Sequence, residues 1–439
     1  MRSYTTLEPI YSLATPYRQS ALQIIRVSGD DSLKMVSRLF SRPKSLLGAK
    51  SNTLVHGYIS DLEGNRIDEV VISVYHSGHG YTGEEALEIT GHGSLPAIDA
   101  ISRALESVGF RQSLPGEFTY RAFMHGRMDL TEAEAVEEIV KAKSRTAESS
   151  ALDRLSGHLS NLLSSIREKL LYILSTLEVQ LDYAEDEILD DWVFPHEDVD
   201  VIIETLKRVA ASYDSSRMYA DGAIVVLAGK TNAGKSSLFN ALLKENRAIV
   251  SSEEGTTRDF IEAECNISGL PVRLYDTAGL RETEGEIEKE GIRRSRKLME
   301  DADLVIYVTD GTDPYLPEAD DRTMVVYSKR DLGNHGDDKT SFSSVTGEGL
   351  GELIAKIRER LVKEEVKDNG LPSIESKRQR DAMLEVVETL ETAKEHEGIS
   401  VDLMAMYFSE ALNGIGVITG EVSTEELLDN LFTNFCLGK

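Results

Sequence analysis

The glycine-rich segment 229–236, Gly-Lys-Thr-Asn-Ala-Gly-Lys-Ser, limits what this chain can fold into more than any other feature. It fits the pattern G-x-x-x-x-G-K-[ST], follows an apolar run (224–228) and precedes a helix-forming run (236–243). A strand, a glycine loop and a helix in this order let backbone N–H groups and the positive helix end cradle a β-phosphate. Lys235 can neutralise phosphate charge, and Ser236 is placed to bind Mg²⁺. The segment therefore predicts a nucleotide site in an α/β fold.

The sequence around this loop alternates between strand and helix. Apolar runs at 272–275, 304–309 and 324–328 predict further buried strands, and 350–361 predicts a helix. Such alternation is typical of a parallel sheet covered on both faces. We therefore predict an α/β domain over residues 222–371.

The chain on either side of this domain has a different character. Residues 1–119 combine β-type runs (22–27, 70–75) with one helix (95–108), which predicts an α+β domain. From residue 120 apolar residues recur at helical spacing, above all from Leu155 to Leu177, and helix returns after Gly370, Leu371 and Pro372. The later helices are predicted at 382–393, 403–412 and 424–432. We therefore predict a multidomain α+β and α/β protein, in which a discontinuous helical domain (120–221 and 372–439) carries the inserted α/β domain.

Charge and cysteine content narrow the class of protein. The 439 residues include 48 Lys or Arg and 76 Asp or Glu, for a net charge of −28, which argues against unaided tight binding to nucleic acid. The two cysteines, Cys265 and Cys436, exclude a disulfide framework and suit a reducing cytosol. The apolar runs are shorter than the about 20 residues of a membrane span, and residues 1–16 lack a secretory pattern. We expect a cytoplasmic protein that does not enter a membrane.

Two further segments fit the handling of a γ-phosphate. Asp-Thr-Ala-Gly (276–279) ends a predicted hairpin, where the carboxylate can hold Mg²⁺ through water and the Gly279 N–H can meet the γ-phosphate. Gly-Thr-Thr-Arg-Asp (255–259) lies between the phosphate loop and this hairpin, as a switch segment should, and Thr257 can bind Mg²⁺ when γ-phosphate is present. Leu280 stands where Ras-like GTPases carry the glutamine that orients water, so another group must do so.

A third segment predicts recognition of guanine. In Ser-Lys-Arg-Asp (328–331), Asp331 can accept hydrogen bonds from both the ring N–H and the exocyclic amine of guanine. Ser328 departs from the usual Asn, and Ser-Ser-Val (343–345) departs from the usual Ser-Ala-Lys of the second base loop. The alternative for 328–331 is an exposed turn. We expect guanine selectivity from a base site that lacks some of the usual side chains.

The switch and hairpin motifs together resemble the translation-factor-related GTPases, and the flanking segments narrow the resemblance to the MnmE (TrmE) family. These flanking segments are 80–85, 88–93, 115–119, 121–123, 129–130 and 435–439. They occur in the family's order from near Ile24 to Lys439. The resemblance implies an N-terminal α+β folate-binding domain, a discontinuous helical domain and an inserted Ras-like P-loop G domain.

The resemblance also implies an activity and partners. The family hydrolyses GTP with K⁺ stimulation and Mg²⁺, and with the FAD-dependent protein MnmG it adds a carboxymethylaminomethyl group at position 5 of the wobble uridine of certain tRNAs. A formyl-tetrahydrofolate is the implied one-carbon donor, and residues 1–119 would also mediate a homodimer. The acidic net charge agrees with contact to tRNA largely through the partner.

Matching positions assign roles that the residues alone do not reveal. Folate contacts fall on Arg26, Glu88, Arg127 and Lys439, potassium ligands on Asn232, Ser251, Glu253 and Thr256, and magnesium ligands on Ser236 and Thr257. Glu288 matches the glutamate that orients water, and with Lys235 and Thr257 completes the expected catalytic set. Cys436 is either a reactive thiol or a buried cysteine. The expected GTP-binding residues are Asn232, Ala233, Gly234, Lys235, Ser236, Ser237, Ser251, Thr256, Thr257, Asp276, Thr277, Ala278, Gly279, Lys329 and Asp331.

Two rival functions stay open at this point. A GTPase switch in ribosome assembly or RNA maturation would usually bring a Lys/Arg-rich RNA-binding segment, and none is evident. A folate-binding scaffold with a degenerate nucleotide site is opposed by the intact Lys235, Ser236 and Asp276. Folate retention by residues 1–119 would separate the first rival from the resemblance, and a GTPase assay would exclude the second.

Overall fold

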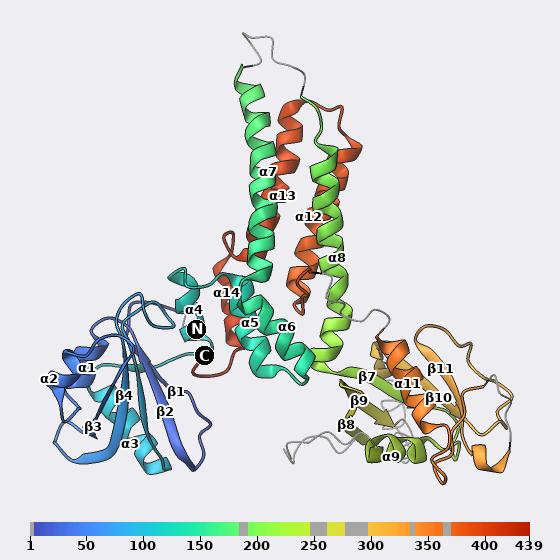
Figure 1. Ribbon diagram of the computed structural model, residues 1–439, viewed down its shortest axis with the longest axis horizontal. Coiled ribbons are helices and arrows are strands. Elements are labelled where there is room, and N and C mark those ends of the chain that lie inside the picture. Colours follow the sequence, from blue (N-terminus) through green and yellow to red (C-terminus); the bar gives the residue numbers. More distant parts are fainter. Residues whose placement is uncertain (1–3, 184–191, 246–260, 277–296, 334–338, 363–369) are drawn as a thin grey trace, which may run out of the picture. The chain divides into compact units, whose positions relative to one another are not determined.

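The computed structural model describes residues 4–183, 192–245, 261–276, 297–333, 339–362 and 370–439 (Figure 1). Internal contacts divide the chain into two compact units. The first comprises Met1–Glu137, Leu155–Val193 and Glu395–Lys439, and the second Glu138–Arg154 and Phe194–Lys394. The domain boundaries expected from the sequence stay a prediction.

A six-stranded sheet organises the start of the first unit. Its strand order is β3-β4-β5-β2-β1-β6, and every neighbouring pair is antiparallel except β1 with β6. The strands are β1 (Ile10–Leu13), β2 (Ser20–Ser28), β3 (Thr53–Ser60), β4 (Arg66–Tyr75), β5 (Ala86–Gly93) and β6 (Arg111–Gln112). Period-2 alternation buries Ile25 and Val27 of β2 and places Arg26 on the other face. The buried face packs against α1 (Ser32–Ser37) and α3 (Leu95–Ser107), which confirms the expected α+β fold.

Helices make up the rest of the first unit. They are α4 (Glu117–Met124), the start of α5 (Leu130–Lys141), α7 (His158–Tyr183), α13 (Val401–Thr419) and α14 (Glu425–Thr433), and a short α2 (Pro43–Leu47) lies beside α1. The apolar residues that recur at helical spacing from Leu155 to Leu177 belong to two helices. Leu155 ends α6 (Arg145–Leu155), and Gly157 adopts φ 88°, a left-handed conformation that breaks the helix before His158.

One described helix, α13, is long and apolar enough to cross a membrane by length and composition. A core helix of a soluble protein passes the same test, and α13 packs along α7 and buries side chains that include Phe408 and Ile415. Its apolar character is therefore weak support for a membrane span.

The second unit contains a five-stranded sheet of order β11-β10-β7-β9-β8. Four strands are parallel, and β8 joins the edge as the antiparallel partner of β9. The strands are β7 (Ala223–Ala228), β8 (Ile261–Ile267), β9 (Leu270–Asp276), β10 (Leu304–Thr309) and β11 (Thr323–Tyr327). Side chains of α9 (Lys235–Glu245) and α11 (Leu350–Leu361) complete the core, as the alternating pattern predicts.

Helices α6, α8 (His196–Asp221) and α12 (Lys377–Glu395) also belong to the second unit. Arg154 of α6 is fully buried and donates to Glu138 and to the backbone oxygen of Ser373, and it pairs with Glu375 at 3.0 Å. Burial raises the pKa of Glu375, and Arg154 opposes that rise. Arg154 thus fixes the segment by which the chain leaves the α/β part.

Candidate functional site

The phosphate loop lies between β7 and α9, where the sequence predicts it. Gly229 (φ 134°) and Gly234 (φ 101°) adopt conformations that disfavour a side chain, and a Cβ on Gly229 would lie 2.1 Å from the carbonyl oxygen of Val308. Asn232 also adopts a positive φ of 61°. The glycines therefore permit a close approach of the loop to β10 and shape the cradle that a phosphate requires.

Lys235 and Ser236 carry the polar groups of this cradle. Lys235 is buried, and its Nζ donates to the carbonyl oxygens of Gly229 at 2.9 Å and Lys230 at 2.7 Å. Ser236 Oγ donates to Asp276 Oδ2 at 2.8 Å. An exposed hydroxyl and a carboxylate that meet beside a phosphate loop form the oxygen donor set that Mg²⁺ prefers, so these residues fit the ion.

The segment 328–331 approaches the same loop. Ser328 is buried, and its Oγ donates to the carbonyl oxygen of Ala233 at 2.7 Å, so it connects the base loop to the phosphate loop. The carboxylate of Asp331 is exposed, and the buried Ser343 Oγ donates to its Oδ1 at 2.6 Å. This hydrogen bond sets the direction of the carboxylate. Lys329 has φ 60° and pairs with Asp310 at 2.9 Å. The structure thus brings the segment that carries Lys329 and Asp331 beside the phosphate loop.

Part of the expected site lies outside the described residues. Among the described members, Ala233 and Gly234 lie in the loop, and exposed Ser237 follows Ser236 on the first turn of α9. The residues outside are Ser251, Glu253, Thr256, Thr257, Thr277, Ala278, Gly279 and Glu288.

Sequence reasoning missed the turn that follows β10. Asp313 Oδ1 lies 2.9 Å from Lys230 Nζ, and Tyr307 Oη donates to Asp313 Oδ2 at 2.6 Å. The hydrogen bonds from Tyr307 and Lys230 hold the pKa of Asp313 below its usual value. The hydroxyl of Thr312 and the ammonium of Lys329 likewise lower the pKa of Asp310. Because β10 lies next to β7 in a parallel sheet, polar residues after β10 could have been expected beside the phosphate loop.

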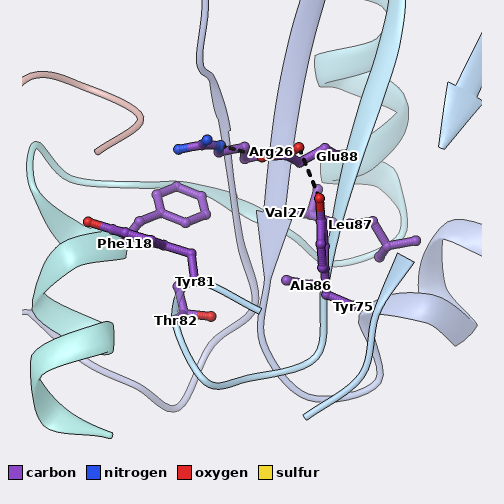
Figure 2. Close-up of a pocket in the computed structure, with 9 residues that line it drawn as sticks. All are labelled: Arg26, Val27, Tyr75, Tyr81, Thr82, Ala86, Leu87, Glu88 and Phe118. Atoms are coloured by element: carbon purple, nitrogen blue, oxygen red, sulfur yellow. Dashed lines mark hydrogen bonds and ion pairs between the residues drawn. The ribbon is translucent and has the colours of Figure 1, made fainter. Parts of the chain in front are cut away.

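A cavity of about 160 Å³ opens in the first unit (Figure 2). Its walls are mostly apolar and aromatic, with one arginine and one carboxylate. The lining residues are Arg26, Val27, Tyr75, Tyr81, Thr82, Ala86, Leu87, Glu88 and Phe118. Arg26 and Glu88 face each other on β2 and β5, and Arg26 Nε donates to Glu88 Oε1 at 2.8 Å. Both side chains keep more than a quarter of their surface exposed (29% and 27%), so a ligand can reach either one.

The two other expected folate residues, Lys439 and Arg127, lie near the cavity through different segments. The C-terminal segment reaches the cavity, because Arg26 Nη1 approaches the Gly438 carbonyl oxygen at 3.5 Å and the Phe118 N–H donates to Lys439 O at 3.2 Å. Burial, and then the charge of Arg26, lower the pKa of Lys439. Exposed Arg127 packs over Gly83, where a Cβ would lie 3.2 Å from its Cγ. Cys436 is exposed, so the alternative of a buried cysteine is wrong.

A buried ionic network supports the loop that carries Tyr81 and Thr82. Arg121 of α4 is fully buried and donates to Glu84 at 3.1 and 3.2 Å and to Glu117 at 3.1 Å. It also donates to the backbone oxygens of Thr5 and Glu8. The sequence identifies Arg121 only as part of a family segment, since periodicity does not distinguish a buried arginine from an exposed one.

Comparisons with known proteins identify the family of the chain. Residues 130–436 match the family model described as the MnmE helical domain, and residues 9–127 match that of the GTP-binding protein TrmE N-terminus. A tRNA modification GTPase MnmE of Treponema denticola is 38% identical over 467 residues, covering 99% of both chains. One of Borrelia recurrentis is 39% identical over 469 residues, covering 100% of both.

A solved structure, the G domain of the T. maritima FeoB iron transporter, is 32% identical and covers 32% of this chain and 97% of its own, with a TM-score of 0.24. The expected resemblance and fold class are confirmed by the matches of the two family models and of the full-length relatives. The chain belongs to the MnmE family of tRNA modification GTPases.

Proposed function

We propose that this GTPase is stimulated by K⁺ and, as a homodimer with the FAD-dependent partner MnmG, adds a carboxymethylaminomethyl group at position 5 of the wobble uridine of certain tRNAs. The observation that carries the proposal is the presence of two built sites in one chain, a phosphate loop with Ser236 and Asp276 and an aromatic cavity with Arg26 and Glu88. A formyl-tetrahydrofolate-type donor would occupy the cavity. We also propose a cytoplasmic location, which the two cysteines and the acidic charge favour.

The nucleotide site would act by positioning and charge. Lys235 exchanges its two carbonyl partners for phosphate oxygens, and the N–H groups of Ala233 to Ser236 support the β-phosphate. Ser236, Asp276 and Thr257 would hold Mg²⁺, which when bound would neutralise negative charge on the phosphates. Glu288 would orient the attacking water, the task that Leu280 is unable to perform. Asp331, directed by Ser343, would select guanine.

Asn232, with Ser251, Glu253 and Thr256, would hold K⁺, which neutralises charge that develops between the β- and γ-phosphates. The left-handed backbone and exposed side chain of Asn232 support this role, since they present an amide oxygen at the loop surface. Na⁺ is too small to reach the same oxygens without strain.

The cation proposal is tested by steady-state GTP hydrolysis in matched KCl and NaCl. Wild type should be much faster in KCl, and Asn232→Lys should be largely indifferent to the salt because its ammonium would replace the cation. Glu288→Ala should lower turnover with unchanged nucleotide affinity. Equal wild-type rates in the two salts would refute the cation role, and an unimpaired Glu288→Ala would refute the role of that residue.

The cavity matches a flat, partly charged heterocycle with an acidic tail. Tyr75, Tyr81 and Phe118 offer aromatic surfaces, and Glu88 can accept hydrogen bonds from a ring N–H and an amine. Arg127 and Lys439 would pair with the carboxylates of the tail. A bound folate would supply the one-carbon unit that becomes part of the uridine substituent.

Calorimetric titration with 5-formyltetrahydrofolate tests this assignment. Arg127→Ala and deletion of Lys439 should each weaken folate binding, because a charge-assisted hydrogen bond contributes on the order of 1.5–3 kcal/mol. GTP affinity should be unchanged. Arg103→Ala, which removes an exposed arginine of α3, is the matched control. Wild-type folate affinity in both variants would contradict the assignment, and mass spectrometry of wobble uridines from cells without the gene would test the tRNA product.

A further inference from the structure

The turn after β10 carries two carboxylates that pair with lysines of the phosphate loop and the base loop. Asp313 pairs with Lys230, the second residue of the phosphate loop, and Asp310 pairs with Lys329 of the base loop, each at 2.9 Å. We propose that Asp313 is a positioning residue that holds the phosphate loop in its nucleotide-binding conformation through Lys230. This role does not depend on the identity of the folate or of the monovalent cation.

Asp313 is the fixed member of the pair. Its side chain is 4% exposed, whereas that of Lys230 is 57% exposed. Tyr307 Oη donates to one carboxylate oxygen at 2.6 Å, and the Tyr315 N–H donates to the other at 3.1 Å. These bonds set the direction of the carboxylate before the lysine arrives. The exposed lysine therefore takes its position from the buried aspartate.

The phosphate loop needs such support because its backbone is not of low energy. Asn232 has φ 61°, and non-glycine residues with positive φ persist only where the surroundings hold them. Lys235 holds the carbonyl oxygens of Gly229 and Lys230. When Lys235 turns to a phosphate, those carbonyls lose it, whereas the contact of the Lys230 side chain with Asp313 can persist. Asp313 would thus hold the loop in both states.

A pure charge effect and a positioning effect predict opposite changes in nucleotide affinity when the Asp313 charge is removed. A negative carboxylate close to a phosphate site repels the nucleotide, so its removal would tighten binding if charge alone mattered. Positioning predicts the opposite, since the loop without its anchor loses order that the nucleotide must restore. The direction of the change separates the two.

The test uses the full-length protein and its Asp313→Asn variant. GDP dissociation constants come from calorimetry, and KM and kcat from steady-state GTP hydrolysis in KCl. We expect the dissociation constant and KM to rise about two- to fivefold, the range for a pair with one exposed member, while kcat at saturating GTP is unchanged. A general folding defect would instead lower kcat by reducing the active fraction. Asp320→Asn, which removes an equal charge near the start of β11 where Asp320 accepts from the Arg322 N–H, is the matched control.

Variants of Lys230 complete a double-mutant cycle. Lys230→Arg keeps the pair and should bind GDP like wild type, Lys230→Met should weaken binding, and the double variant should be no weaker than the weaker single variant. Tighter or unchanged GDP binding by Asp313→Asn, or fully additive losses, would overturn the proposal. If Asp313→Asn folds poorly, Lys230→Met provides the test. Its loss of nucleotide affinity must be equal for GDP and for a non-hydrolysable GTP analogue. The loss must also persist in about 0.5 M KCl, because an affinity loss that salt removes comes from charge alone.

Discussion

Replacement of Arg121 by methionine should loosen the folded structure around the candidate folate cavity. Arg121 is fully buried and makes ion pairs with Glu84 and Glu117, which are also buried, at 3.1 Å each. Methionine has a similar length and fills much of the space, so the penalty comes chiefly from the charges left behind. Removal of one partner from a buried ion pair costs about 3–5 kcal/mol. Glu117 would still pair with Arg111 at 2.5 Å, so most of the penalty comes from the unpaired charge of Glu84.

The affected segment is the loop that lines the cavity. Glu84 follows Tyr81 and Thr82, and Ser28 Oγ donates to its carboxylate at 2.7 Å. An unpaired Glu84 carboxylate would move toward water and carry this loop with it. Folate binding should therefore weaken together with local stability, while GTP hydrolysis, which the second unit performs, should be unchanged.

Hydrogen exchange followed by mass spectrometry is the suitable assay, because a multidomain chain does not unfold in one two-state step. A local loss of about 3–5 kcal/mol corresponds to exchange about a hundredfold to a few thousandfold faster, so peptides covering 80–93 and 117–124 should show it. Arg103→Met on α3 is the matched control and should leave these peptides unchanged. Acceleration of less than about tenfold in Arg121→Met would refute the view that Arg121 neutralises buried charge.

Three further outcomes are expected. Burial alone would raise the pKa of Glu117, but hydrogen bonds from Arg111 and from the Leu114 N–H outweigh it and hold the pKa below its usual value. The ionised Glu117 carboxylate therefore stabilises the fold above the unfolded pKa of about 4.3, and this stabilisation is lost as pH falls through the folded pKa. Glu117→Gln should reduce the loss of folding free energy at acid pH. An acid loss equal to that of wild type would contradict this. Asp331→Asn should remove the preference for GTP over xanthosine triphosphate in competition binding, and retained GTP preference would mean that 328–331 is only a turn. Ser236→Ala should raise the Mg²⁺ concentration needed for half-maximal hydrolysis, since one oxygen donor is lost, whereas an unshifted Mg²⁺ titration would exclude Ser236 as a ligand.

Local pattern was sufficient for the secondary structure and for the phosphate loop. The loop conformation depends on glycines at 229 and 234 and on the strand and helix beside them, all within about twenty residues, so their spacing reveals it. Helical periodicity likewise predicts the helix that contains Leu159 and Leu177, but it does not show that left-handed Gly157 separates α6 from α7. Backbone propensity and side-chain spacing act over one or two turns, and over this range the sequence predicts the local structure.

Long-range partners required the folded chain. Arg26 meets Glu88, 62 residues away, because β2 and β5 are neighbours in register, and it meets Gly438, 412 residues away, because the C-terminal segment packs against α4. Asp313 reaches Lys230 because β10 lies beside β7. Ser328 departs from the usual residue yet still binds the phosphate loop, through a hydroxyl placed by burial rather than by any motif. Strand order and register are decided by the packing of whole faces, which no local pattern records.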